Sequence, residues 1–134
     1  MRRVLLASAV LLIGPACGGL ATLGPTAPGE GIEFFMHANF AGSSQAVNVD
    51  VRDLEKVEGP CARGEEGETP TWSDCISSVR VHPGWTATLY KDREFKGMST
   101  TLTADALNLR DVSGPCDGSF NDCVSSIRVV RLGQ

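Results

Sequence analysis

Apolar residues occupy every second position in two stretches of the chain, residues 47–51 and residues 85–89. A period of two is that of a β-strand with one face buried and the other in solvent. No stretch after Ile32 keeps the helical period over the length of an ordinary helix, so at most short helical turns are expected around Leu54 and Leu107. The pattern therefore predicts an all-β domain that begins at Ile32.

Much of this pattern occurs twice along the chain. Ten positions within residues 35–61 reappear 55 residues later within residues 90–116, and seven positions within residues 72–81 reappear 48 residues later within residues 120–129. A repeat of roughly fifty residues is too small to bury an apolar face alone. We therefore expect the two repeats to pack across a shared core as a β-sandwich.

The first repeat carries seven additional residues, within the acidic and glycine-containing segment 62–70. An insertion that is confined to a polar segment predicts a loop on the surface of the domain. We favour a loop that is only solvated, and a recognition loop is the alternative.

The start of the chain has the features of an export signal. Arg2 and Arg3 precede an apolar run over residues 4–13, and small residues follow as far as Ala16. This apolar run is too short to span a membrane, so residues 1–16 are predicted to be a signal peptide. The protein is therefore expected to be exported.

Residues 17–31 are rich in Gly, Pro, Ala and Thr and show no periodicity, which predicts a flexible linker. Cys17 follows Ala16 in an arrangement that resembles the lipobox of bacterial lipoproteins, in which this cysteine carries the lipid. Gly14 and Pro15 depart from the lipobox pattern, so cleavage by an ordinary signal peptidase is the alternative. The expected product is a secreted, periplasmic or membrane-anchored lipoprotein, tethered in the last case through Cys17.

The charge of the predicted mature chain restricts its partners. Without residues 1–16 the chain holds 10 basic and 16 acidic residues, which gives a net charge of −6. Nucleic acids and anionic membrane surfaces require clustered Lys and Arg, so neither is an expected partner. An acidic chain suits the recruitment of cations.

Each repeat contains an acidic and hydroxyl-rich loop directly before a predicted strand. The two loops are Ser-Asp-Cys-Ile-Ser-Ser at 73–78 and Asn-Asp-Cys-Val-Ser-Ser at 121–126. Carboxylate, amide, hydroxyl and backbone oxygens are the ligands that Ca²⁺ accepts, so a pair of such loops favours a calcium site. The alternative is that Asp and Ser only make hydrogen bonds within turns.

Two ordered motifs give the sequence a specific resemblance. The pattern aromatic-x4-Phe-x-Gly occurs in residues 35–42 and 90–97, and each copy is followed by one of the Asp-x-x-Ser-Ser loops. This order resembles the two Greek key motifs of a βγ-crystallin domain. The resemblance implies a β-sandwich of about eight strands over residues 32–134, with motif one at residues 32–84 and motif two at residues 85–134.

The resemblance also implies roles for individual positions of each motif. A glycine two residues after the Phe allows a positive φ that a side chain would resist, so the hairpin can fold over the sheet and its two aromatic rings can cover one another. Ser78 and Ser126, the last residues of the two loops, match the family's structural serine, which hydrogen-bonds to that hairpin.

The family's calcium-binding loop is Asn/Asp, Asn/Asp, two variable residues, Ser/Thr and Ser. Residues 121–126 match it at every defined place, whereas residues 73–78 depart from it at Ser73. In this family the two loops exchange ligands, so the resemblance implies one or two calcium ions held by both motifs. The implied ligands are carboxylates, hydroxyls, an amide or its backbone carbonyl, and the backbone carbonyl after each hairpin aromatic: Asp74, Asp122, Ser77, Ser125, Asn121, Met36 and Lys91.

Four of the five cysteines lie in the repeats and can pair among themselves, which leaves Cys17 as the odd one. The symmetric pairing joins Cys61 to Cys75 and Cys116 to Cys123. Such bridges would hold the ligand loops in shape before calcium binds. A zinc site is disfavoured, because the Cys-x6-Cys spacing is not that of a zinc ribbon and an exported chain favours disulfides.

An enzyme is not expected from this sequence. His37 and His82 have no counterparts in the other repeat, and neither a nucleophile motif nor a phosphate-binding glycine loop is present. The leading hypothesis is an exported calcium-binding structural module with two disulfides. The alternative is an extracellular interaction or protease-inhibitor module of the same fold, with segment 62–70 as its contact loop, and the sequence does not predict which protein it would contact.

Overall fold

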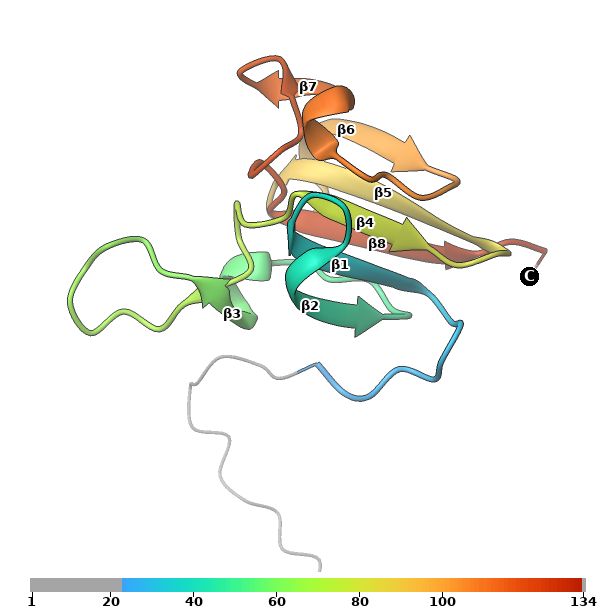
Figure 1. Cartoon of the computed structure of the whole chain (residues 1–134), viewed down its shortest axis with the longest axis horizontal. Coiled ribbons are helices and arrows are strands. Elements are labelled where there is room, and N and C mark those ends of the chain that lie inside the picture. The colour runs from blue at the N-terminus through green and yellow to red at the C-terminus, as the bar shows by residue number, and fades with distance from the viewer. Residues whose placement is uncertain (1–22, 134) are drawn as a thin grey trace, which may run out of the picture.

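The computed structural model describes residues 23–133, so the predicted signal peptide (residues 1–16), Cys17 and the first part of the linker lie outside the described residues. Within residues 23–133, strands and 3₁₀ helices follow one another in the same order twice (Figure 1). No helix in this range is long and apolar enough to cross a membrane. The elements of the first repeat are β1 (Ile32–His37), β2 (Ala41–Val47), η1 (Leu54–Lys56), β3 (Glu58–Cys61) and β4 (Ser78–Val81). Those of the second repeat are β5 (Trp85–Asp92), β6 (Lys96–Leu102), η2 (Leu109–Asp111), β7 (Ser113–Cys116) and β8 (Ser126–Arg131).

Six of the eight strands form two antiparallel sheets, with strand orders β2-β1-β4 and β6-β5-β8. Each sheet gains a segment from the other repeat. Val51 exchanges two backbone hydrogen bonds with Ile127 of β8 (2.8 and 2.9 Å), and Ala106 does the same with Val79 of β4 (2.8 and 3.0 Å). This crossing between sheets confirms the predicted all-β sandwich of two Greek key motifs.

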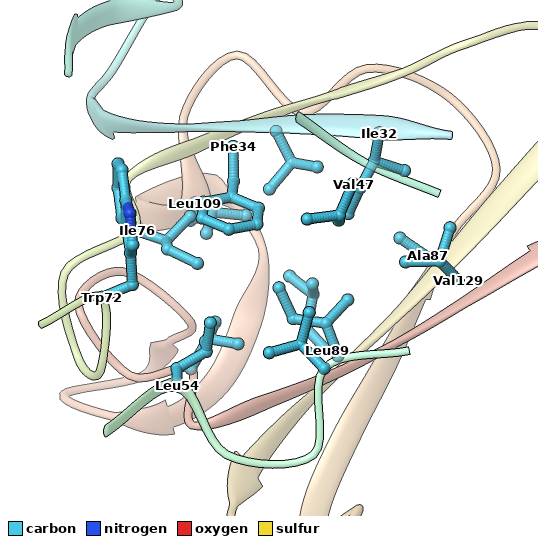
Figure 2. Close-up of a cluster of buried hydrophobic side chains, with 14 of the residues drawn as sticks. Ile32, Phe34, Val47, Leu54, Trp72, Ile76, Ala87, Leu89, Leu109 and Val129 are labelled. Atoms are coloured by element: carbon cyan, nitrogen blue, oxygen red, sulfur yellow. The ribbon is translucent and has the colours of Figure 1, made fainter. Parts of the chain in front are cut away.

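Side chains from both sheets meet in one core between them (Figure 2). The period of two in residues 85–89 is confirmed within β5, since Ala87 and Leu89 are fully buried. The ring of Phe34 from β1 lies edge-on to the ring of Trp72, with 4.9 Å between the ring centroids. Neither repeat therefore has a core of its own.

The prediction of one half-buried strand over residues 47–51 is wrong. Strand β2 ends at Val47, and the Val49 side chain is 58% exposed. The chain leaves its own sheet after Val47 and pairs with the opposite sheet at Val51, so the two buried valines belong to different sheets. Val47 and Val51 are both buried because the chain contacts the core once before and once after it crosses between the sheets. A single strand does not account for the alternating pattern.

The two hairpins have the glycine geometry that the sequence predicts. Gly42 and Gly97 have φ angles of 78° and 77°, in the left-handed region that favours glycine. A Cβ atom at Gly42 would collide with the ring of His37, and one at Gly97 would collide with the carboxylate of Asp92. Both clashing groups are the ends of exposed side chains that can move, so the left-handed backbone is the feature that requires glycine at these two positions.

The aromatic pairs of the hairpins cover one another, as predicted. The ring centroids of Phe35 and Phe40 are 5.3 Å apart, and those of Tyr90 and Phe95 are 5.7 Å apart. The guanidinium of Arg80 lies over the Phe40 ring at 4.4 Å, a cation–π contact. These contacts hold each hairpin against its own sheet.

The last serine of each loop holds the same hairpins from beneath. The Ser78 hydroxyl donates to the backbone carbonyl of His37 (2.6 Å) and accepts from the backbone N–H of Phe40 (3.1 Å). Ser126 makes the same two hydrogen bonds in the second hairpin, at 2.6 and 3.0 Å. Both serines are fully buried, so their role is architectural.

The described part of the predicted linker contacts the domain. Leu23 packs against the core, and the Thr26 hydroxyl donates to the backbone carbonyl of Ala46 at 3.2 Å. The Asn48 amide donates to the Glu30 carboxylate at 3.3 Å. These contacts attach residues 23–31 to the end of β2.

Candidate metal centre

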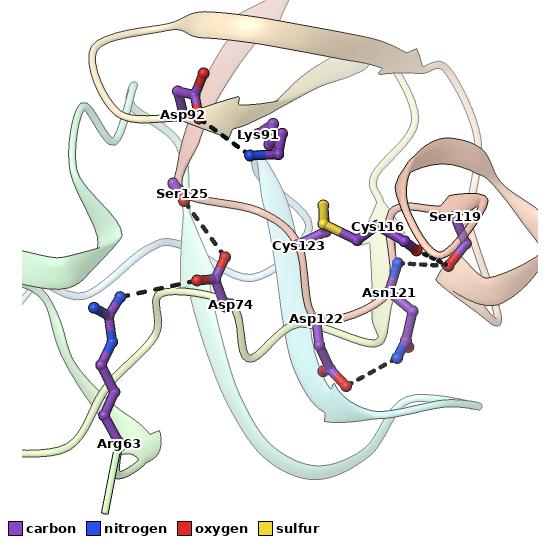
Figure 3. The surroundings of a disulfide bond; sticks show 10 residues. All are labelled: Arg63, Asp74, Lys91, Asp92, Cys116, Ser119, Asn121, Asp122, Cys123 and Ser125. Carbon is purple, nitrogen blue, oxygen red and sulfur yellow. Dashed lines mark hydrogen bonds and ion pairs between the residues drawn. A yellow bond between two sulfur atoms is a disulfide. The ribbon is translucent and has the colours of Figure 1, made fainter. Parts of the chain in front are cut away.

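The two acidic loops lie side by side, as the resemblance implies (Figure 3). The backbone N–H of Asp74 donates to the carbonyl of Val124, and the backbone N–H of Asp122 donates to the carbonyl of Ile76, both at 3.0 Å. The pairing is reciprocal, because each loop gives one hydrogen bond and receives one. Loops that are far apart in the sequence are thereby brought into one site.

Each loop aspartate has a left-handed backbone, with φ of 53° at Asp74 and 49° at Asp122. Aspartate tolerates this conformation better than most residues other than glycine. Each carboxylate then faces the first serine of the other loop. The Ser77 hydroxyl donates to Asp122 Oδ1 at 3.2 Å, and the Ser125 hydroxyl reaches Asp74 Oδ1 at 3.5 Å.

The backbone after each hairpin aromatic is held next to the same serines. The Ser77 N–H donates to the carbonyl of Phe35, the residue before Met36, at 2.9 Å. The Ser125 N–H makes the equivalent bond to the carbonyl of Tyr90, the residue before Lys91, also at 2.9 Å. The two positions that the resemblance assigns as carbonyl ligands therefore lie beside the loops.

We define the first site as Met36, Ser77, Asn121 and Asp122. These four residues line one pocket, together with Asp74 and Arg110 among others. The Asn121 side-chain amide donates to Asp122 Oδ2 at 2.9 Å, so the two carboxylate oxygens of Asp122 each have a neighbouring polar group. The structure thus gathers one carboxylate, one hydroxyl and one amide from both motifs.

We define the second site as Ser73, Asp74, Lys91 and Ser125. The structure brings the Ser125 hydroxyl and the Asp74 carboxylate together, but Ser73 and Ser125 line a different pocket from Asp74. The Lys91 ammonium lies 3.6 Å from the carboxylate of Asp92. The second site is therefore less complete than the first.

Arg63 contacts the second site, although no sequence motif predicts this contact. Its guanidinium donates to the Ser73 hydroxyl (3.2 Å) and pairs with the carboxylates of Glu55 (2.9 Å) and Asp74 (3.8 Å). Partial burial raises the pKa of the Asp74 carboxyl above its ordinary value, while Arg63 and the Ser125 hydroxyl act in the opposite direction. In the sequence, the one indication of this contact is the insertion that contains Arg63.

Two disulfides staple the loops, Cys61–Cys75 and Cys116–Cys123, with Cα–Cα distances of 5.9 Å in both. This is the symmetric arrangement, with one bridge in each motif. Cys75 and Cys123 are the third residues of their loops, so each bridge fixes a loop directly beside its aspartate. The loops are therefore held in shape by covalent bonds.

The donor set of the first site suits a hard cation. Carboxylate, hydroxyl, amide and backbone carbonyl oxygens are the ligands that Ca²⁺ prefers, and none of them is a soft ligand. Within residues 23–133, no three His, Cys, Asp or Glu side chains gather in a way that could hold a metal ion. A cation at this site would thus depend on hydroxyl and backbone oxygens as much as on carboxylates.

Known proteins resemble this chain over most of its length. Residues 34–102, about half of the chain, match the family model of peptidase inhibitor family I36. Spherulin-3A of Physarum polycephalum is 31% identical over 116 residues, which cover 87% of this chain and 94% of spherulin-3A. The development-specific protein S homolog of Myxococcus xanthus is 34% identical over 101 residues, which are 75% of this chain and 48% of that protein, so the chain matches about half its length.

A solved βγ-crystallin domain of Flavobacterium johnsoniae shares the fold, with a TM-score of 0.55 and 31% identity over 77% of this chain and 97% of that domain. Together, the sandwich of two Greek key motifs and these relatives define a βγ-crystallin domain, which confirms the resemblance seen in the sequence. The chain belongs to the βγ-crystallin family, and its residues 34–102 also place it in peptidase inhibitor family I36.

Proposed function

We propose that this βγ-crystallin domain is an exported structural module that binds calcium at the first site. One observation carries the proposal: the Ser77 hydroxyl of motif one lies 3.2 Å from the Asp122 carboxylate of motif two. Both oxygens therefore border the same space, and they come from opposite halves of the molecule. A cation held between them would tie the two motifs together.

The residues of the first site fit a calcium ion by their chemistry. The Asp122 carboxylate, the Ser77 hydroxyl, the Asn121 oxygens and the Met36 backbone carbonyl would hold the ion, which supplies positive charge between the loops when it is bound. With one carboxylate in this set, the dissociation constant is expected to be modest, on the order of 10⁻⁶ to 10⁻⁴ M. The two disulfides favour binding, because the loops are held in shape beforehand.

Calcium is expected to raise the melting temperature of the mature chain, and Asp122→Ala is expected to abolish the increase. At a free calcium concentration one hundred times the dissociation constant, one site adds about 2.7 kcal/mol to the free energy of unfolding. For a domain of this size, the melting temperature should rise by roughly 10 °C or more. Thermal melting in millimolar calcium and in chelator measures the change.

A matched control for this variant is Asp117→Ala. Asp117 is also an exposed aspartate with a left-handed backbone (φ 52°), but it lies outside the site, in the turn after β7. Both variants place alanine, which tolerates the left-handed region less well than aspartate, at a position with positive φ. Only Asp122→Ala also removes a proposed calcium ligand. Equal melting temperatures of the wild-type protein in calcium and in chelator would refute the proposal, and so would a full calcium response of Asp122→Ala.

Export is the other part of the proposal. The predicted signal peptide over residues 1–16 supports it, and so do two disulfides, which persist in oxidising compartments outside the cytoplasm. Cys17 would be the point of lipid attachment if the lipobox is used. Mass spectrometry of the mature N-terminus separates a lipidated Cys17 from an ordinary signal-peptidase product.

Peptidase inhibition is a second candidate function, and the match to peptidase inhibitor family I36 favours it. The inserted segment is exposed from residue 62 to residue 69 and extends away from the sandwich as a long loop after β3 (Figure 1). A loop on a rigid, disulfide-braced domain can enter the active site of a peptidase. The calcium site and the loop are compatible with one another.

If this second function holds, the mature chain should inhibit a purified secreted peptidase, and replacement of residues 64–69 by a Gly/Ser linker of equal length should remove the inhibition. The linker variant retains Arg63, so its calcium-induced melting shift is the internal control. A panel of serine and metallopeptidases provides the assay. If the mature chain inhibits none of these peptidases but still binds calcium, the inhibitor function is rejected and the calcium proposal is unaffected.

A further inference from the structure

The two calcium-type sites are related by the repeat, but among residues 23–133 an arginine pairs with the loop aspartate in only one of them. We infer that the Arg63 guanidinium takes the place of a second calcium ion, so that the inserted segment limits this chain to one ion. This inference rests on the proposed calcium function and goes beyond it, because it fixes the number of ions and the residue that determines it.

The contacts of Arg63 are those of a cation built into the second site. The guanidinium pairs with Asp74 at 3.8 Å and with Glu55 at 2.9 Å, and it donates to the Ser73 hydroxyl at 3.2 Å. Figure 3 shows it directed at the Asp74 carboxylate, where it approaches Oδ2 while the Ser125 hydroxyl approaches Oδ1. The Arg63 guanidinium therefore already provides the positive charge that a calcium ion would place beside Asp74.

Ser73 is the single position at which the loop 73–78 departs from the family's calcium-binding pattern. In the structure its hydroxyl accepts a hydrogen bond from Arg63, so the departure and the arginine belong to one arrangement. The planar guanidinium has several N–H donors in a fixed geometry, which allows it to serve Glu55, Ser73 and Asp74 together. A divalent ion in the same place would meet a like charge.

A covalent bond holds Arg63 near the site. Arg63 lies two residues after Cys61, and Cys61 is bonded to Cys75, the residue that follows Asp74. The start of the inserted segment is thus held close to the loop, although residues 62–69, Arg63 included, are exposed to solvent. The second motif has no such insertion, which explains why the arrangement occurs on one side only.

The test counts the calcium ions bound per chain by isothermal titration calorimetry of the mature protein. Arg63→Gln removes the positive charge and keeps a side chain that can hydrogen-bond to Ser73. The matched control is Arg93→Gln, because Arg93 pairs with Asp53 and Glu55 beside the site and does not contact Asp74. The double variant Arg63→Gln/Asp74→Ala shows whether a new ion uses the second site.

We expect one ion for the wild-type protein and for Arg93→Gln, two for Arg63→Gln, and one for the double variant. The additional ion should bind with a dissociation constant on the order of 10⁻⁵ to 10⁻³ M. Two ions on the wild-type protein, or one ion on Arg63→Gln, would overturn the inference and leave the proposed function standing.

The remaining outcomes separate the two claims. If the wild-type protein binds no calcium and Arg63→Gln binds one ion that is lost in the double variant, the role of Arg63 at the second site stands, whereas the count of one ion and the proposed first site are wrong. If none of the four proteins binds calcium, both claims are overturned.

Discussion

Replacement of Phe34 by alanine is expected to lower the free energy of unfolding by about 3 to 5 kcal/mol. The Phe34 side chain is fully buried between the two sheets, and its ring lies edge-on to that of Trp72, 4.9 Å away. Truncation removes apolar burial from the one core that both motifs share and leaves a cavity that the surrounding structure closes only in part. Urea unfolding in chelator measures the loss without a contribution from calcium.

The control for this variant is Val49→Ala. Val49 alternates with polar residues in the sequence, but its side chain is 58% exposed. Its truncation should change the free energy of unfolding by no more than about 0.5 kcal/mol. Comparable losses for the two variants would contradict the described crossing of the chain between sheets.

Removal of the Cys61–Cys75 bridge, by alanine at both positions, is expected to lower the free energy of unfolding by about 3 kcal/mol. The bridge joins residues 14 positions apart, and its loss frees this segment in the unfolded chain. The same pair of substitutions should also release the start of the inserted segment that carries Arg63. Denaturant unfolding of the wild-type and variant proteins gives the difference.

The second bridge provides an internal comparison. Cys116 and Cys123 are only 7 positions apart, so their removal should cost less, about 2.4 kcal/mol on the same model. Cys75 and Cys123 are both almost fully buried, so the cavity left at each should be similar. A larger loss from the shorter bridge would show that loop entropy does not determine the effect.

The sequence predicted the architecture because the repeat makes each local signal appear twice. Gly42 and Gly97 occur at equivalent places and have the same φ angle to within one degree, and Ser78 and Ser126 make the same pair of hydrogen bonds. Such features depend on residues close in sequence and on a resemblance carried by several positions. They can therefore be recognised from the amino-acid sequence alone.

Contacts between the motifs were harder to predict. Asp50 accepts a hydrogen bond from the backbone N–H of Val129, and Asp105 accepts one from that of Val81, both at 2.8 Å. These aspartates were visible as repeated residues, but their partners lie in the opposite motif. The same limit explains the error at Val49, because the alternating pattern does not show that the chain changes sheets between Val47 and Val51.

The candidate site was also predictable only in part. The reciprocal placement of Ser77 against Asp122 and of Ser125 against Asp74 follows from the symmetry of the repeats. Arg63 breaks that symmetry, and it belongs to an insertion with no counterpart in the second motif. Because the inserted loop has no counterpart in the second repeat, the sequence does not indicate which residues Arg63 contacts. The structure identifies them.

The most direct test of the calcium proposal is a crystal structure of the mature chain grown in millimolar calcium. We predict one ion at the first site, about 2.3 to 2.6 Å from the Ser77 hydroxyl, an Asp122 carboxylate oxygen and the Met36 carbonyl. The Arg63 guanidinium should still lie beside Asp74, with no ion at the second site. Electron density that shows water in place of an ion between Ser77 and Asp122 would contradict the proposal.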